Sequence, residues 1–257
     1  MFQVSREPGV STRAVGHARW VRISHGILTA SILTLAFTGF VILMAHPRLY
    51  WGEVGNDLTP ALIDLPISRN YKHGGWDKVT PVSDNAAGPI SANRTYDIFN
   101  QNGWGRSLHF FAAWWLFVPG LVYLLAGALG GHFRSHLWPK AQELSPALLR
   151  RDVLDHLRLR IPPASGGPQY ALLQKLTYSS VVFLVAPLMV LTGLTMSPAV
   201  TAGIPVLLRL FGGYQSARTV HFFTFVVLVL FVLVHVVMVA RSGFKRQIRG
   251  MTLGEMR

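Results

Sequence analysis

The sequence lacks cysteine altogether and has few charged residues, acidic ones above all. Without cysteine the chain forms no disulfide, iron–sulfur cluster, thiolate-bound haem, covalently attached haem or cysteine zinc site. Charged residues make up 14% of the 257, against about 25% in a typical soluble domain. Apolar residues reach 51%, so there are too few polar groups to cover the surface of a water-soluble protein.

The apolar residues gather in four stretches, each long enough to cross a bilayer. A membrane helix needs about 20 mainly apolar residues. The four expected spans cover about 20–45, 107–129, 172–196 and 219–240. Pro187 lies inside the third span and predicts a kink there. The sequence therefore predicts an all-α integral membrane protein, a four-helix bundle formed by a single domain over residues 1–257.

Basic residues are distributed unevenly about these spans. Of the 24 Lys and Arg, 16 fall on the side that carries both termini and 8 fall on the other side. Lys and Arg favour the cytoplasmic side, so both termini are expected in the cytoplasm of a bacterial inner membrane and loop 46–106 in the periplasm. The same cations predict contact with anionic membrane lipid and not with nucleic acid. Segment 146–160 has apolar residues at helical spacing among arginines, which predicts an amphipathic helix on the cytoplasmic surface.

Four of the ten histidines lie inside or at the edge of a span, and they are His25, His109, His221 and His235. An ionisable residue at membrane depth is a functional-site hypothesis, although a lone histidine can simply bond a neighbouring helix. His221 and His235 are 14 residues apart, close to four helical turns, so they face one direction about 21 Å apart. Depth pairs His25 with His235 in the inner half, and His109 with His221 in the outer half. Two stacked bis-histidine pairs in a four-helix bundle predict two b-type haems, whereas zinc would need further ligands.

The remaining histidines are weaker candidates for the same role. His46 lies level with the outer pair but precedes Pro47 at a helix end. The others lie at or beyond the inner boundary (His17, His132 and His136) or in segments expected at the solvent or the interface (His73 and His156).

Arginine and glycine recur at matched positions around these histidines. Arg22, Arg106 and Arg218 each precede a candidate ligand by three residues, which places both on one helix face. Each arginine is thus a candidate partner for a haem propionate, or an ordinary cation at the end of a span. Gly39 and Gly193 occur in the similar strings AFTGF and VLTGL, where glycine permits close approach of either a porphyrin or another helix. The third span has no histidine and is expected only to complete the bundle.

The chain resembles the bacterial dihaem cytochrome b superfamily, cytochrome b561 of the bacterial and nickel-hydrogenase type, which also includes the formate dehydrogenase gamma subunit. It is most similar to the thiosulfate reductase-like cytochrome b subunit. The resemblance is carried by HPRLYWGE (46–53), GWGRSLHFFAAW (103–114), LQKLTYSSVV (173–182) and GGYQSARTVHFF (212–223). It implies that the haem ligands are His25, His109, His221 and His235. Gly26 departs from the family, where an aromatic residue often follows the first ligand.

The resemblance also implies a function. Such a subunit carries electrons between the quinone pool (ubiquinone or menaquinone) and a periplasmic partner, in this branch often a molybdopterin oxidoreductase. Catalytic residues are then expected in the partner and none in this chain. One alternative is a stand-alone membrane quinone oxidoreductase that acts on a small oxidant or reductant such as superoxide. An alternative of another class is a haem-free membrane transporter, which should show broken helices or paired repeats.

The two sides of the membrane are expected to serve different reactants. Donors that could hold a quinone carbonyl lie near the inner pair (Arg19, Arg22, Ser24 and Arg241). The loop 46–106 is rich in aromatic residues suited to a protein contact (Trp51, Tyr71, Trp76 and Tyr96). We therefore expect quinone near the inner haem and the partner near the outer one.

Overall fold

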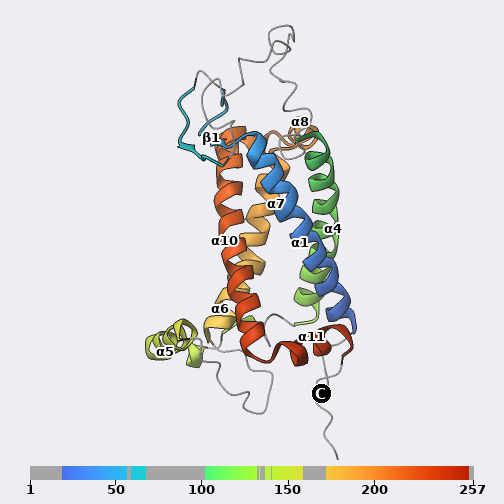
Figure 1. The fold of residues 1–257 in the computed structure, drawn as a ribbon, viewed down its shortest axis with the longest axis vertical. Coiled ribbons are helices and arrows are strands. Elements are labelled where there is room, and N and C mark those ends of the chain that lie inside the picture. The colour runs from blue at the N-terminus through green and yellow to red at the C-terminus, as the bar shows by residue number, and fades with distance from the viewer. Residues whose placement is uncertain are drawn as a thin grey trace, which may run out of the picture.

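Four long helices run side by side in the computed structural model, which describes residues 19–56, 59–67, 102–131, 133, 137–139, 141–158 and 172–254 (Figure 1). The helices are α1 (Arg19–Ala45), α4 (Asn102–Leu129), a third rod built from α6 (Leu172–Ser180), η4 (Val181–Val185) and α7 (Ala186–Thr195), and α10 (Tyr214–Arg241). All four are long and apolar enough to cross a membrane. The expected all-α membrane bundle is confirmed.

Two of the helices begin before the apolar stretch that predicted them. The helix α4 starts at Asn102 and α10 starts at Tyr214, each five residues ahead of the expected span. Their first turns contain glycine and polar residues, which lower the hydropathy without ending the helix. The helices therefore extend beyond the hydrocarbon core.

The third rod contains a π-helical turn at Val181–Val185, immediately ahead of Pro187. Proline has no N–H and its ring crowds the carbonyl four residues earlier. A π turn adds one residue to the turn and so relieves that crowding. The structure thus shows a π-helical turn next to Pro187, where the sequence predicts a kink.

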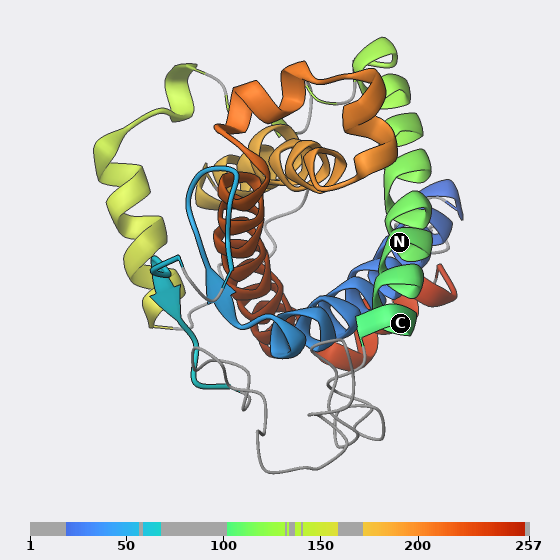
Figure 2. The same ribbon diagram turned by 90° about the horizontal axis from the view of Figure 1, so that it is seen from above.

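The bundle consists of two helix pairs, α1 with α4 and α7 with α10, as the view along its axis shows (Figure 2). Gly105 on α4 lets α1 approach closely, because a Cβ there would lie 3.1 Å from the fully buried side chain of Val41. Among the described residues, extensive backbone packing occurs within each pair and not between the pairs.

We call the end of the bundle where α1 finishes the loop end. Here residues 46–56, which we call the strap, cross the first turn of α10. The carbonyl of Gly52 accepts from the backbone N–H groups of Gln215 and Ser216 at 2.9 and 3.2 Å. The hydroxyl of Thr219 donates to the carbonyl of Tyr50 at 2.6 Å. The strap therefore satisfies N–H groups that a helix N-terminus otherwise leaves unpaired.

Three further elements complete the loop end. The strand β1 (Arg48–Leu49) in the strap pairs antiparallel with β2 (Ile63–Asp64). The short helices α8 (Pro198–Gly203) and α9 (Val206–Phe211) connect α7 to α10. Most of the predicted periplasmic loop, residues 57–58 and 68–101, lies outside the described residues.

We call the opposite end the terminal end. The helix α5 (Pro146–Leu157) covers most of the predicted segment 146–160, of which residues 159–160 lie outside the described residues. A three-residue turn, η3 (Ala141–Glu143), brings the carboxylate of Glu143 within 2.7 and 2.8 Å of the buried ammonium of Lys175. The last helix, α11 (Phe244–Thr252), is basic, and the sequence reasoning did not anticipate it.

Candidate functional site

The structure places the four membrane histidines in two facing pairs. His25 on α1 faces His235 on α10, with ring centroids 6.5 Å apart. His109 on α4 faces His221 on α10, with ring centroids 6.4 Å apart. Each pair therefore bridges the two helix pairs, and α10 contributes one histidine to each. The pairing is the one that membrane depth predicts.

The separation of the rings indicates what fits between them. A direct N–H···N bond of about 3 Å would bring the two centroids to about 5 Å. A metal ion with an imidazole nitrogen about 2.0–2.1 Å away on each side would place them about 6–6.5 Å apart. The observed distances match the second arrangement.

A threonine from the neighbouring helix contacts each histidine of the loop-end pair. Thr38 Oγ1 on α1 lies 2.9 Å from His109 Nδ1, and Thr192 Oγ1 on α7 lies 2.8 Å from His221 Nδ1. Both threonines are completely buried. The rod that was expected only to complete the bundle thus supplies a histidine partner.

These contacts favour the imidazole tautomer that carries its proton on Nδ1. The hydroxyl of Thr38 lies 2.7 Å from the carbonyl of Thr34, and that of Thr192 lies 2.7 Å from the carbonyl of Leu188. A carbonyl only accepts, so each hydroxyl donates to it and accepts the Nδ1–H of the histidine. The Nε2 lone pair is then free to bind a metal, as in other metal sites with an outer-shell acceptor.

The glycines that follow these threonines adjoin the same imidazole rings. A Cβ on Gly39 would lie 3.4 Å from His109 Cε1, and a Cβ on Gly193 would lie 3.6 Å from His221 Cε1. A methyl group would be in van der Waals contact with the ring, so a larger side chain would have to point away from the ring or displace it. The Thr-Gly dipeptide in AFTGF and VLTGL thus binds a histidine Nδ1 through the threonine hydroxyl and leaves room for the ring at the glycine.

The terminal-end pair has different surroundings. His25 Nδ1 lies 3.4 Å from Thr29 Oγ1, one turn along its own helix. The ring of His235 stacks on Phe231, with centroids 5.9 Å apart and planes 24° apart. His25 is exposed and His235 is half-buried, so this pair is less enclosed than the loop-end pair.

The three RxxH arginines differ in their contacts. Arg22 donates to the carbonyl of Thr252 at 2.8 Å, while its buried Nε has no partner among the residues that the structure describes. Arg106 is exposed. Arg218 donates to the carbonyl of His46 in the strap and contacts Gln215 Oε1 at 3.4 Å. Within the described part of the chain, one other buried side-chain nitrogen lacks a partner, Nε1 of Trp104.

The other histidines occupy different settings. The side chain of His46 is exposed at the end of α1, and His156 on α5 contacts the carbonyl of Asp152 at 2.8 Å through Nδ1. The rest lie outside the described residues (His17, His73, His132 and His136). Where the structure is described, no three His, Cys, Asp or Glu residues gather as a metal cluster.

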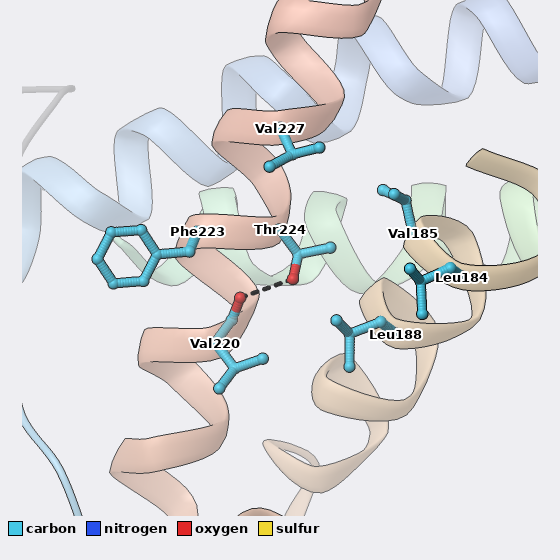
Figure 3. A pocket seen from close by; sticks show the side chains of 7 residues that line it. All are labelled: Leu184, Val185, Leu188, Val220, Phe223, Thr224 and Val227. Carbon is cyan, nitrogen blue, oxygen red and sulfur yellow. Dashed lines mark hydrogen bonds between the residues drawn. The ribbon is translucent and has the colours of Figure 1, made fainter. Parts of the chain in front are cut away.

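An apolar pocket of about 380 Å³ lies between α10 and the third rod, and Figure 3 shows the side chains that line it. Thr224 supplies its single hydroxyl, which donates to the carbonyl of Val220 at 2.8 Å. The remaining lining residues are apolar (Leu184, Val185, Leu188, Phe223 and Val227). The pocket suits a hydrocarbon chain and offers nothing to bind a charged group.

Comparison with known proteins identifies the family. The model of prokaryotic cytochrome b561 matches residues 16–254. The chain belongs to the prokaryotic cytochrome b561 family. It is also 30% identical over 226 residues to the putative protein-methionine-sulfoxide reductase subunit YedZ1 of Azospira oryzae, covering 87% of this chain and 89% of that protein. No solved structure matches the chain.

Family membership implies a membrane protein that binds b-type haem and transfers electrons. The residues present fit that group. Two imidazoles face each other at a metal-binding distance, and the tautomers of His109 and His221 leave Nε2 free. Gly39 and Gly193 keep side chains away from the rings. Sequence reasoning singled out these glycines but missed Thr38 and Thr192, which the repeated Thr-Gly dipeptide could have indicated.

Proposed function

We propose that this chain is a membrane electron-transfer subunit that binds two b-type haems and connects a quinone in the membrane with an oxidoreductase partner in the periplasm. The observation that carries the proposal is the presence of two facing imidazole pairs at 6.5 and 6.4 Å. His25 and His235 would hold one haem, and His109 and His221 the other. Bound haem supplies one-electron exchange between ferric and ferrous iron.

The protein's own residues set the arrangement for electron transfer. Two ligands 14 residues apart on α10 are separated by about 21 Å along the helix, most of the roughly 30 Å hydrocarbon core. Both pairs lie on helices that are long and apolar enough to cross a membrane. One helix therefore positions a redox centre near each face of the membrane.

We propose that the quinone binds at the terminal end, and the distribution of cations supports a cytoplasmic position for this end. Arg22 lies one turn from His25, and its buried Nε has no hydrogen-bond partner among the described residues. This N–H could donate a hydrogen bond to a quinone carbonyl or to a haem propionate. Arg19, Ser24 and Arg241 lie near the same end of the bundle.

The partner is assigned to the loop end. The strap presents Trp51, which is 63% exposed, beside the first turn of α10. An exposed aromatic residue of this kind is enriched in protein interfaces. The name of the Azospira relative describes a subunit of a protein-methionine-sulfoxide reductase. We therefore propose a partner that acts on methionine sulfoxide in proteins and carries a molybdopterin cofactor.

The alternatives have less support. A relative named as a subunit favours a partner over a stand-alone quinone oxidoreductase acting on an oxidant such as superoxide. Membership in a cytochrome family argues against a haem-free transporter.

The proposal is tested by counting haems in purified protein with the pyridine haemochrome assay. The unmodified chain should contain two b haems. His109→Ala and His221→Ala should each remove the loop-end haem, and His25→Ala and His235→Ala the other. The control is His156→Ala, on α5, which should retain both. One haem per unmodified chain, or full haem content in all four variants, would exclude the two-haem function.

A further inference from the structure

Two buried threonines stand in matched positions against the loop-end histidines. Thr38 on α1 contacts His109 on α4, and Thr192 on α7 contacts His221 on α10. In both cases the threonine belongs to the helix that packs beside the histidine's own helix. The same threonine–histidine contact therefore occurs twice, once in each helix pair.

Each hydroxyl is the middle member of a chain of hydrogen bonds. The imidazole Nδ1–H donates to the hydroxyl, and the hydroxyl donates to a helix carbonyl, that of Thr34 or Leu188. A hydroxyl that donates becomes a better acceptor. A histidine whose Nδ1–H is bound in this way is a more basic ligand through Nε2.

We propose that Thr38 and Thr192 are positioning residues that lower the reduction potential of the loop-end haem and leave that of the terminal-end haem unchanged. The inference rests on the proposed function, since it requires His109 and His221 to be haem ligands. A more strongly donating imidazole stabilises the ferric state over the less positively charged ferrous state. Removing either hydroxyl should therefore raise the potential.

The effect is confined to one end of the bundle by distance. His221 and His235 are separated by 14 residues of continuous helix, about 21 Å. Both threonine hydroxyls contact the loop-end pair. A variant at either position should therefore move one component of a redox titration and not the other.

The test is a potentiometric titration of the purified holoprotein, followed by haem absorption. Thr38→Val and Thr192→Val replace the hydroxyl with a methyl group, whereas Thr38→Ala and Thr192→Ala only remove atoms and introduce no collision. Thr38→Ser and Thr192→Ser retain the hydroxyl. Thr224→Val is the matched control, because Thr224 is also buried and also donates to the carbonyl four residues earlier.

One redox component should shift to higher potential in the valine and alanine variants, and further in the double variant. It should return towards its original value in the serine variants. Electron paramagnetic resonance of the oxidised protein should show a change in one of two low-spin haem signals. Thr224→Val should change neither measurement.

Unchanged potentials in variants that retain both haems would overturn the inference, as would an equal shift of both components or the same shift in Thr224→Val. Loss of the loop-end haem in the valine and alanine variants, with retention in serine, would also overturn it, because the hydroxyl would then serve binding alone. Fewer than two haems in the unmodified protein would contradict the proposed function instead.

Discussion

The guanidinium of Arg22, at the start of α1, donates to the carbonyl oxygen of Thr252, at the end of α11, across 230 residues of sequence. A Cβ on Gly254 would lie 2.9 Å from Nη1 of the same arginine. The basic C-terminal helix is thereby held beside the helix that carries His25. Arg22 thus joins the two ends of the described chain next to one of the imidazole pairs.

Arg22→Gln is expected to release α11 and to slow quinol-driven reduction of the terminal-end haem. A hydrogen bond from a charged group contributes about 1.5–3 kcal/mol, and less where it is exposed as here. Hydrogen exchange in residues 244–252 should become faster, and stopped-flow reduction by quinol should become slower. Arg22→Lys serves as the control for charge. Normal quinol reduction with both haems retained would place the quinone elsewhere.

Gly39→Val and Gly193→Val are expected to remove the loop-end haem. The branched side chain would crowd the ring of His109 or His221, because the Cβ alone would already be in van der Waals contact with Cε1, at 3.4 or 3.6 Å. Gly120→Val is the matched control, since a Cβ there meets nothing within 4 Å. Haem content should fall by half in the first two variants only. Full haem content in both variants would show that the imidazole rings do not need the space beside Gly39 and Gly193.

Glu143→Gln is expected to destabilise the protein by about 2–3 kcal/mol. Breaking a fully buried ion pair costs about 3–5 kcal/mol, and the effect is smaller here because the carboxylate is 32% exposed. The stability would be lost because the buried ammonium of Lys175, whose side chain is 7% exposed, would no longer be paired with a carboxylate. The double variant Glu143→Gln, Lys175→Met should recover most of the stability that the single variant loses. Thermal unfolding in detergent would measure both effects. A single variant as stable as the parent would mean that the pair has no structural role.

The orientation of the chain can be tested with single cysteines, because the sequence has none of its own. Ala202 on α8 and Ala147 on α5 are both exposed, at opposite ends of the bundle. In intact cells an impermeant maleimide should label Ala202→Cys and not Ala147→Cys. The reverse pattern would invert the proposed topology.

Much of the fold could be predicted from the sequence because the membrane imposes simple requirements. Four apolar stretches of sufficient length predict four helices, and depth alone pairs His25 with His235 and His109 with His221. Helix periodicity also places both α10 histidines on one face. These predictions depend on distance along the chain and need no knowledge of how side chains pack.

Features that depend on contacts between distant residues could not be predicted in the same way. The role of Thr192 depends on α7 lying beside α10, which a span without histidine does not indicate. Arg218 has the same RxxH spacing as Arg22, yet it donates to the strap because the chain returns over α10. Spacing indicates which helix face a residue occupies, whereas its partner depends on the neighbouring segment.

The division of the bundle into two helix pairs bears on how the protein matures. A newly inserted chain without cofactor would retain the packing of α1 on α4 and of α7 on α10, but its four imidazoles would have no metal to join them. Haem acquisition would then fix the distance between the pairs, and its binding energy would add directly to the stability of the folded state. Bound haem would therefore add connections at membrane depth to those that the strap and Arg22 already make at the two ends of the bundle.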